Sequence, residues 1–95
     1  MPLYAFIGRD GARGAELRRE HRPAHLKRLE DLARAGKIPH AGPLLDEAGK
    51  PTGSLILFEA LDLASARRFA AADPYVREGV FASHEVLETR VVFPT

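Results

Sequence analysis

Leu3-Tyr-Ala-Phe-Ile7 decides the fold, because this short run is apolar on both sides of the strand that it predicts. Ser54-Leu-Ile-Leu-Phe-Glu59 has the same character through its four central residues. A strand with one face in water would alternate apolar and polar residues instead. We therefore expect two strands of one sheet, with both faces of the sheet covered.

A long helical pattern follows the first strand, from about Ala15 to Ala35. Its apolar residues and two of its histidines recur at spacings of three and four, which places them on one stripe of a helix. Pro23 interrupts the pattern, so the main helix either begins or kinks there, and Gly36 is a natural stop. The stripe consists of Leu17, His21, His25, Leu29, Leu32 and Ala33.

The remaining segments complete a β-α-β-β-α-β order. This order predicts an α+β domain of the ferredoxin-like split βαβ type, with both helices on one sheet face. The second sheet face then has no cover within the chain, so we expect a homodimer in which two sheets pack together. The other segments are an irregular or edge strand at 37–45, a polar turn at 46–53, a helix at 63–72 capped by Asp62, a single turn from Pro74 to Gly79, and a last strand at 83–93.

Length and charge limit the classes of protein to which this chain can belong. Its 95 residues make one domain, expected to span residues 1–95. With 14 basic and 13 acidic side chains, its net charge of +1 argues against a protein that binds nucleic acid or a membrane through charge. An RNA-recognition domain shares the order of elements, but Ser54–Phe58 lacks the basic residue and the repeated aromatics of the RNA-binding strand.

The chain contains no cysteine, which excludes a disulfide, a thiolate nucleophile and a Cys-ligated zinc site. Its N-terminal apolar stretch is about six residues long before Arg9, shorter than a signal peptide or a membrane helix requires. We therefore expect a cytosolic protein.

His25 is the first candidate for chemistry, because it shares the helical stripe with Leu29 and should point at the sheet. An imidazole there can accept or donate a proton near neutral pH. Position alone favours a plainer role, that of a core histidine bonded to a backbone carbonyl. His21 lies at a metal-ligand spacing from His25, but Pro23 distorts the geometry and no third ligand is evident, so we expect no metal site.

Asp73 is the second candidate, since a carboxylate at the C-terminal end of a helix is unfavourably placed unless it has another task. Capping the turn that begins at Pro74 is one such task, and position alone favours it. Because both helices pack on one sheet face, Asp73 can also meet His25, with one carboxylate oxygen capping and the other orienting the imidazole. Ser54 could supply a hydroxyl, although turn chemistry beside Gly53 explains it as well.

Several short segments form an ordered set along nearly the whole chain. They are Phe6-Ile-Gly-Arg-Asp-Gly11, Arg22-Pro-Ala-His25-Leu26, Ala41-Gly-Pro-Leu44, Gly53-Ser54, Asp73-Pro74-Tyr75 and Gly79-Val-Phe81. In this order the set resembles the YCII-related (YciI-like) family. The resemblance implies a ferredoxin-like subunit that dimerises sheet to sheet, in the manner of dimeric α/β barrels. It also implies a His–Asp pair proposed as catalytic, carried here by His25 and Asp73. Members of the family known to be enzymes act on small organic molecules, and their reactions include elimination from substituted aromatics.

We therefore expect a small, cofactor-independent enzyme of the lyase, isomerase or hydrolase type, in which His25 relays a proton and Asp73 holds it. Its pocket would lie between the helices and the sheet, where Arg22, one turn from His25, could meet an anionic substrate. The alternative is a non-catalytic ligand-binding or accessory module on the same fold. The other residues expected to line the pocket are Tyr4, Phe6, Ser54 and Tyr75.

Overall fold

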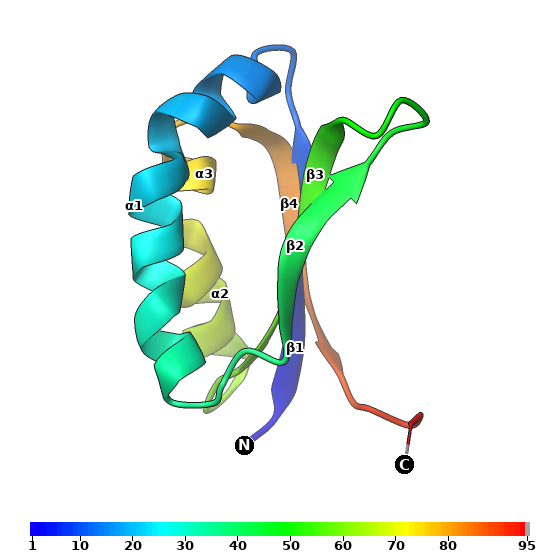
Figure 1. Ribbon diagram of the computed structural model, residues 1–95. Helices are drawn as coiled ribbons and strands as arrows, with labels where there is room; N and C mark the ends of the chain where they lie inside the picture. The colour runs from blue at the N-terminus through cyan, green and yellow to red at the C-terminus, as the bar shows by residue number, and fades with distance from the viewer. Residues whose placement is uncertain (95) are drawn as a thin grey trace.

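Within residues 1–94, which the computed structural model describes, a four-stranded antiparallel sheet carries three helices on one face (Figure 1). The strands lie in the order β2-β3-β1-β4, and all neighbouring strands run antiparallel. This arrangement confirms the predicted ferredoxin-like α+β fold. The elements are β1 (Leu3–Asp10), α1 (Gly14–Arg34), β2 (His40–Leu45), β3 (Pro51–Glu59), α2 (Leu63–Ala71), α3 (Pro74–Arg77) and β4 (Phe81–Thr89).

Alternate residues of the two central strands form the core beneath the helices. In the register of β1 and β3, Tyr4 lies opposite Phe58 and Phe6 lies opposite Ile56. All four side chains are at most 2% exposed, and α2 adds the fully buried Ala66. Burial of each large apolar side chain contributes about 1.5–3 kcal/mol, so these four dominate the packing of helices on the sheet.

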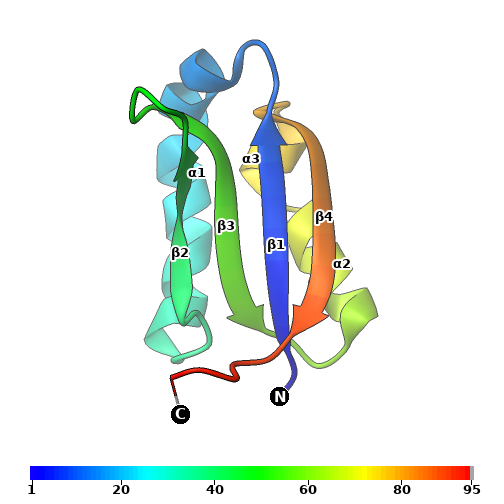
Figure 2. The same ribbon diagram turned by 90° about the vertical axis from the view of Figure 1, so that its right-hand side faces the viewer.

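The other face of the sheet is apolar at its centre. Leu3, Ala5 and Ile7 alternate with the core residues of β1, and the register sets Leu57 and Leu55 of β3 beside them. These side chains are only partly buried, and no helix or strand of residues 1–94 packs over them (Figure 2). Residues 1–94 therefore leave open the face that the strand pattern predicts to be covered.

Helix α1 runs through Pro23 without a break and begins at Gly14, so the proline is not its start. Pro23 is exposed, and its ring removes only the hydrogen bond that the carbonyl of Arg19 would otherwise accept. Ala33, expected on the inward stripe, is exposed, because each four-residue step overshoots a full turn by about 40°. No helix within residues 1–94 combines the length and the apolar character needed to cross a bilayer.

The last strand differs in its limits from the prediction. It spans Phe81–Thr89 rather than 83–93. Its last residue pairs with Leu3, the first residue of β1, so a longer β4 would have no strand to pair with. At its start Phe81 pairs with Asp10, which also makes β1 longer than expected.

Candidate functional site

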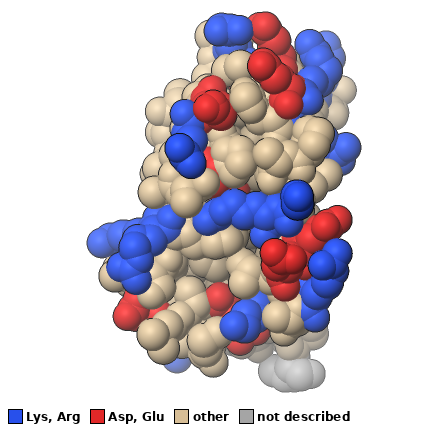
Figure 3. All heavy atoms as spheres, turned by 90° about the vertical axis from the view of Figure 1, so that its left-hand side faces the viewer, with Lys and Arg blue, Asp and Glu red and all other residues tan. Residues whose placement is uncertain are grey.

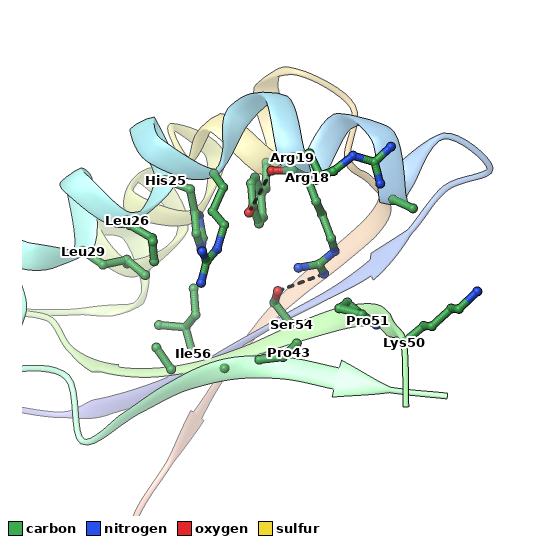
Figure 4. A pocket seen from close by; sticks show the side chains of 15 residues that line it. Arg18, Arg19, His25, Leu26, Leu29, Pro43, Lys50, Pro51, Ser54 and Ile56 are labelled. Atoms are coloured by element: carbon green, nitrogen blue, oxygen red, sulfur yellow. Dashed lines mark hydrogen bonds between the residues drawn. The ribbon is translucent and has the colours of Figure 1, made fainter. Parts of the chain in front are cut away.

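A cavity of about 640 Å³ lies between α1 and the part of the sheet formed by β2 and β3 (Figure 4). Helix α1 contributes His25 and Leu29 to one wall, and β3 contributes Ser54 and Ile56 to the opposite wall. Tyr75 enters from α3. A mostly apolar cavity of this size, with a few polar groups, is typical of a site for a small organic molecule.

His25 and Asp73, 48 residues apart in the sequence, meet beside this cavity. Nδ1 of His25 lies 2.8 Å from Oδ1 of Asp73, and both side chains are buried. A carboxylate can only accept hydrogen bonds, so Nδ1 carries the hydrogen and Nε2 of the neutral ring keeps its lone pair. His25 lines the cavity, and Nε2 has no hydrogen-bond partner among residues 1–94. The ring nitrogen that can act as a base is therefore unengaged.

Asp73 also caps α3, as its sequence position suggests. Its backbone is extended (φ −65, ψ 134), and Oδ1 accepts a hydrogen bond of 2.8 Å from the backbone N–H of Tyr75. The expectation that separate oxygens serve the cap and the imidazole is wrong, because Oδ1 accepts both bonds through its two lone pairs. Oδ2 faces Nη1 of Arg28 at 3.8 Å and has no hydrogen-bond partner among residues 1–94.

Tyr75 fixes the plane of the imidazole. The rings of His25 and Tyr75 are stacked, with centroids 3.9 Å apart and planes 3° from parallel. The hydrogen bond to Asp73 sets the direction of the ring within its plane, and the stack sets the plane itself. Burial raises the pKa of Tyr75, while the charges of Arg18 and Arg22 lower it. The phenol is thus a neutral, rigid support for the histidine.

Arg18 closes one side of the cavity through an ion pair with Asp10. Its Nε and Nη2 lie 2.7 and 2.8 Å from the two carboxylate oxygens of Asp10, and Nη2 also donates to Oγ of Ser54 at 3.0 Å (Figure 4). Gly14 makes room for this pair, because a β-carbon there would lie 2.6 Å from Cβ of Asp10. Ser54 therefore lines the cavity as expected, but its hydroxyl is bonded to Arg18 and not to His25.

Tyr4 and Phe6 lie in the core and not in the cavity lining. Tyr4 packs against Phe58 with ring centroids 6.3 Å apart, and Phe6 packs against Phe81 at 5.9 Å. Both belong to β1, whereas the sheet side of the cavity is made by β2 and β3. Arg22, by contrast, does line the cavity.

Sequence reasoning missed Arg28, which contacts Asp73 and Phe69. It lies three residues after His25, a spacing that puts two side chains on the same side of a helix, and this spacing was the available signal. Its guanidinium carbon is 4.0 Å from the ring centre of Phe69. Burial lowers the pKa of Arg28, and the negative charge of Asp73 acts in the opposite direction.

His21 lies on α1 and is partly buried. Within residues 1–94, no three His, Asp or Glu side chains form a group that could hold a metal ion. The described residues therefore supply no ligand set around His21 and His25.

Comparison with known proteins confirms the family resemblance of the sequence. A model of the YCII-related domain matches residues 2–90. The chain is 37% identical over 97 residues to Protein YciI of Escherichia coli O6:H1, a match that covers 96% of this chain and 99% of that protein. An uncharacterized protein of Haemophilus influenzae is 35% identical over 97 residues, covering 95% of this chain and 98% of its own.

Two solved structures have a similar fold. One is 5-chloro-2-hydroxyhydroquinone dehydrochlorinase (TftG) from Burkholderia phenoliruptrix AC1100, in complex with 2,5-dihydroxybenzoquinone. It matches with a TM-score of 0.82 and 28% identity over 93% of each chain. The other is an uncharacterized NIPSNAP domain protein from Burkholderia xenovorans, which at 14% identity and a TM-score of 0.53, over 100% of this chain and 99% of its own, shows the fold alone.

Proposed function

This chain belongs to the YCII-related family, and on that premise we propose that it is an enzyme in which His25 transfers protons during the conversion of a small organic molecule. One observation carries the proposal: His25 lies between a buried carboxylate and a cavity of a size suited to such a molecule. TftG, whose fold is similar, is a dehydrochlorinase, which supports small-molecule catalysis on this fold.

The two residues have different tasks in this proposal. Nε2 of His25 accepts the proton, and the ring becomes a positively charged imidazolium. The carboxylate of Asp73, 2.8 Å from Nδ1, stabilises that charge where little water can reach it. A positioned base of this kind contributes about 10²–10⁴-fold to a reaction rate. Tyr75 keeps the ring in one plane throughout.

Elimination or isomerisation suits this arrangement best, and hydrolysis is a further possibility for the same base. Nε2 removes a proton from a carbon or an oxygen of the substrate, and the electron pair left behind forms a new double bond. In an elimination the leaving group departs with its own bonding pair, and in an isomerisation the imidazolium returns the proton to a different atom. Neither reaction needs a cofactor, because the substrate supplies the electron pair. Ser54 would contact the substrate from β3, and Tyr75 would contact it from α3.

We also propose that two copies of the chain pair through the open faces of their sheets. Ile7, Leu55 and Leu57 form the apolar centre of that face, and pairing would remove it from water. The cavity lies on the opposite side of the sheet, under α1. Pairing of this kind would therefore leave the whole cavity lining within one chain.

Nitrogen NMR of the His25 ring tests the role of the base. We expect the hydrogen on Nδ1 in the wild type, with Nε2 as the deprotonated nitrogen of the neutral ring. In Asp73→Ala, which has no acceptor at this position, the tautomer population should move toward that of the exposed His40, an internal reference. A wild-type ring with its hydrogen on Nε2 would leave no base facing the cavity, and the proposal would be lost.

Turnover is tested with chlorinated hydroxyhydroquinones, the compound class on which TftG acts, by following release of chloride. The wild type should release chloride, and His25→Gln, which keeps a polar side chain of similar size, should not. If both proteins bind these compounds equally and neither releases chloride, the chain is better described as a ligand-binding module.

A further inference from the structure

Four basic side chains line the cavity, and no acidic one does. Arg18 is neutralised by its ion pair with Asp10. Arg19, Arg22 and Lys50 have no ion pair among residues 1–94. The lining therefore carries three positive charges outside any ion pair of the described residues, all on exposed side chains.

This excess of positive charge is local. The whole chain has a net charge of +1, and basic and acidic side chains are interspersed over the outer helical face (Figure 3). The charge of Arg22 also lowers the pKa of Tyr75, which places this guanidinium close enough to act on a ring stacked against His25. Positive charge concentrated around one cavity attracts anions, and because these side chains are exposed the attraction should weaken as the salt concentration rises.

One end of the cavity is lined mainly by apolar side chains. Leu26 and Leu29 lie at the end remote from Lys50, and Ile56 lies beneath them on β3 (Figure 4). His25 stands beside these leucines, while Lys50 stands at the hairpin end of the cavity (Figure 4). The cavity thus has His25 and apolar side chains at one end and Lys50 at the other, and Arg22 lies on α1 one turn before His25.

We infer that the cavity selects a small organic oxyanion whose carboxylate or phosphate is bound by Arg22 and whose apolar body packs against Leu26 and Leu29. The positive charges of Arg19 and Lys50 attract the anion from further away. The inference takes this cavity to be the substrate site of the proposed enzyme. Arginine presents a planar set of donors that matches both carboxylate and phosphate, so the charge, and not one particular oxyanion, is what the lining recognises. Because Arg22 lies one turn before His25 on α1, an oxyanion bound by Arg22 holds the carbon framework attached to it beside His25.

Benzoate, phenyl phosphate and neutral benzamide are suitable probes, because all three carry the same ring. Binding to the full chain is measured by isothermal titration calorimetry at low salt, and the lining amides are followed by NMR. We expect at least one of the two anions to bind about tenfold more tightly than benzamide, as expected for one charged hydrogen-bonding contact. The comparison of benzoate with phenyl phosphate shows which oxyanion fits better. Benzamide binding as tightly as both anions would overturn the inference.

Variants that remove one positive charge show which side chains are responsible for the preference for anions. Arg22→Gln and Lys50→Gln should each weaken binding of the preferred anion about three- to tenfold and leave benzamide binding unchanged. Lys27→Gln is the matched control, because Lys27 is an exposed basic residue of α1 that does not line the cavity. Equal losses in Lys27→Gln and Arg22→Gln would show a general charge effect and would contradict the site.

These experiments can refute the oxyanion site and the catalytic role of His25 independently of each other. If anion preference is found and depends on Arg22, while His25→Gln turns over every compound as well as the wild type does, the oxyanion site stands and the catalytic proposal falls. If the His25 tautomer is as proposed and the anions show no preference, only the oxyanion site falls.

Discussion

Arg28 and Asp73 face each other across 3.8 Å, from Nη1 to Oδ2, and neither atom has a hydrogen-bond partner among residues 1–94. Phe69 holds the guanidinium in place, with its ring centre 4.0 Å from the guanidinium carbon. The Asp73 side chain is fully buried, whereas that of Arg28 is 26% exposed. Arg28 therefore supplies positive charge to a buried carboxylate through packing and not through a hydrogen bond.

Arg28→Met should lower the free energy of unfolding by about 1–3 kcal/mol, because Asp73 then stays buried with one positive neighbour fewer. Methionine retains much of the contact with Phe69, so the loss reports mainly on charge. Urea denaturation measures the change. Arg34→Met, an exposed change on the same helix, should alter stability by less than about 0.5 kcal/mol. An Arg28→Met protein that unfolds at the wild-type urea concentration would show that this charge is dispensable.

Asp73→Asn should abolish most turnover while leaving the chain folded. Asparagine caps a helix about as well as aspartate, so the N–H of Tyr75 keeps its acceptor. The amide carries no negative charge, so the imidazolium of His25 loses its stabilisation, and kcat should fall by about 10²–10⁴. Steady-state kinetics on a compound that the wild type converts, with thermal unfolding as a check of folding, measures both effects. A folded variant with wild-type kcat would contradict the role given to Asp73.

The fold was predictable because its signals are local. Apolar residues on both sides of Leu3–Ile7 and of 54–59 indicate central strands, and the helical spacing around His25 indicates which side of α1 faces them. Each of these patterns depends on neighbours within a few residues. The ends of β4 did not follow from its own sequence, because they depend on where β1 begins and ends.

The site was predictable only in part, because its contacts join segments far apart in the sequence. That His25 and Asp73 meet follows from helices packed on one sheet face, but the sharing of one oxygen between cap and imidazole depends on distances of a few tenths of an ångström. The bond from Arg18 to Ser54 joins residues 36 apart. The prediction that Tyr4 lines the cavity was wrong for a related reason. An apolar strand pattern does not show which part of the sheet lies under a cavity and which part lies under a tightly packed helix.

Tyr75→Phe separates the ring of this residue from its hydroxyl. Phenylalanine keeps the stack on His25, and the lost hydroxyl contact to the carbonyl of Arg18 is long at 3.4 Å, so stability near neutral pH should change little. Burial raises the pKa of Tyr75 above its ordinary value of 10.0. The neutral phenol of Tyr75 therefore contributes its full stabilisation of the folded protein below pH 10.0. This contribution is lost as the pH rises through the higher pKa that Tyr75 has in the folded protein.

This sign predicts that Tyr75→Phe becomes more stable than the wild type at high pH. Urea denaturation of both proteins on either side of pH 10.0 measures the difference. Tyr75→Leu serves as the contrast, because it removes the stacked ring and should cost about 1–3 kcal/mol near neutral pH. Parallel stability curves for the wild type and Tyr75→Phe would mean that the hydroxyl is not buried enough to matter.

Leu57→Lys should separate the proposed pair of chains. Leu57 lies opposite Ala5 at the centre of the open sheet face, so a lysine there would be enclosed between two sheets in the pair but would reach water in a single chain. Enclosure of an unpaired ammonium costs several kcal/mol, enough to dissociate a modest interface. Sedimentation velocity should give the mass of two chains for the wild type and of one chain for the variant. Leu61→Lys, at a position 72% exposed outside the sheet, should sediment as the wild type does, and a wild type that sediments as a single chain would contradict the pairing.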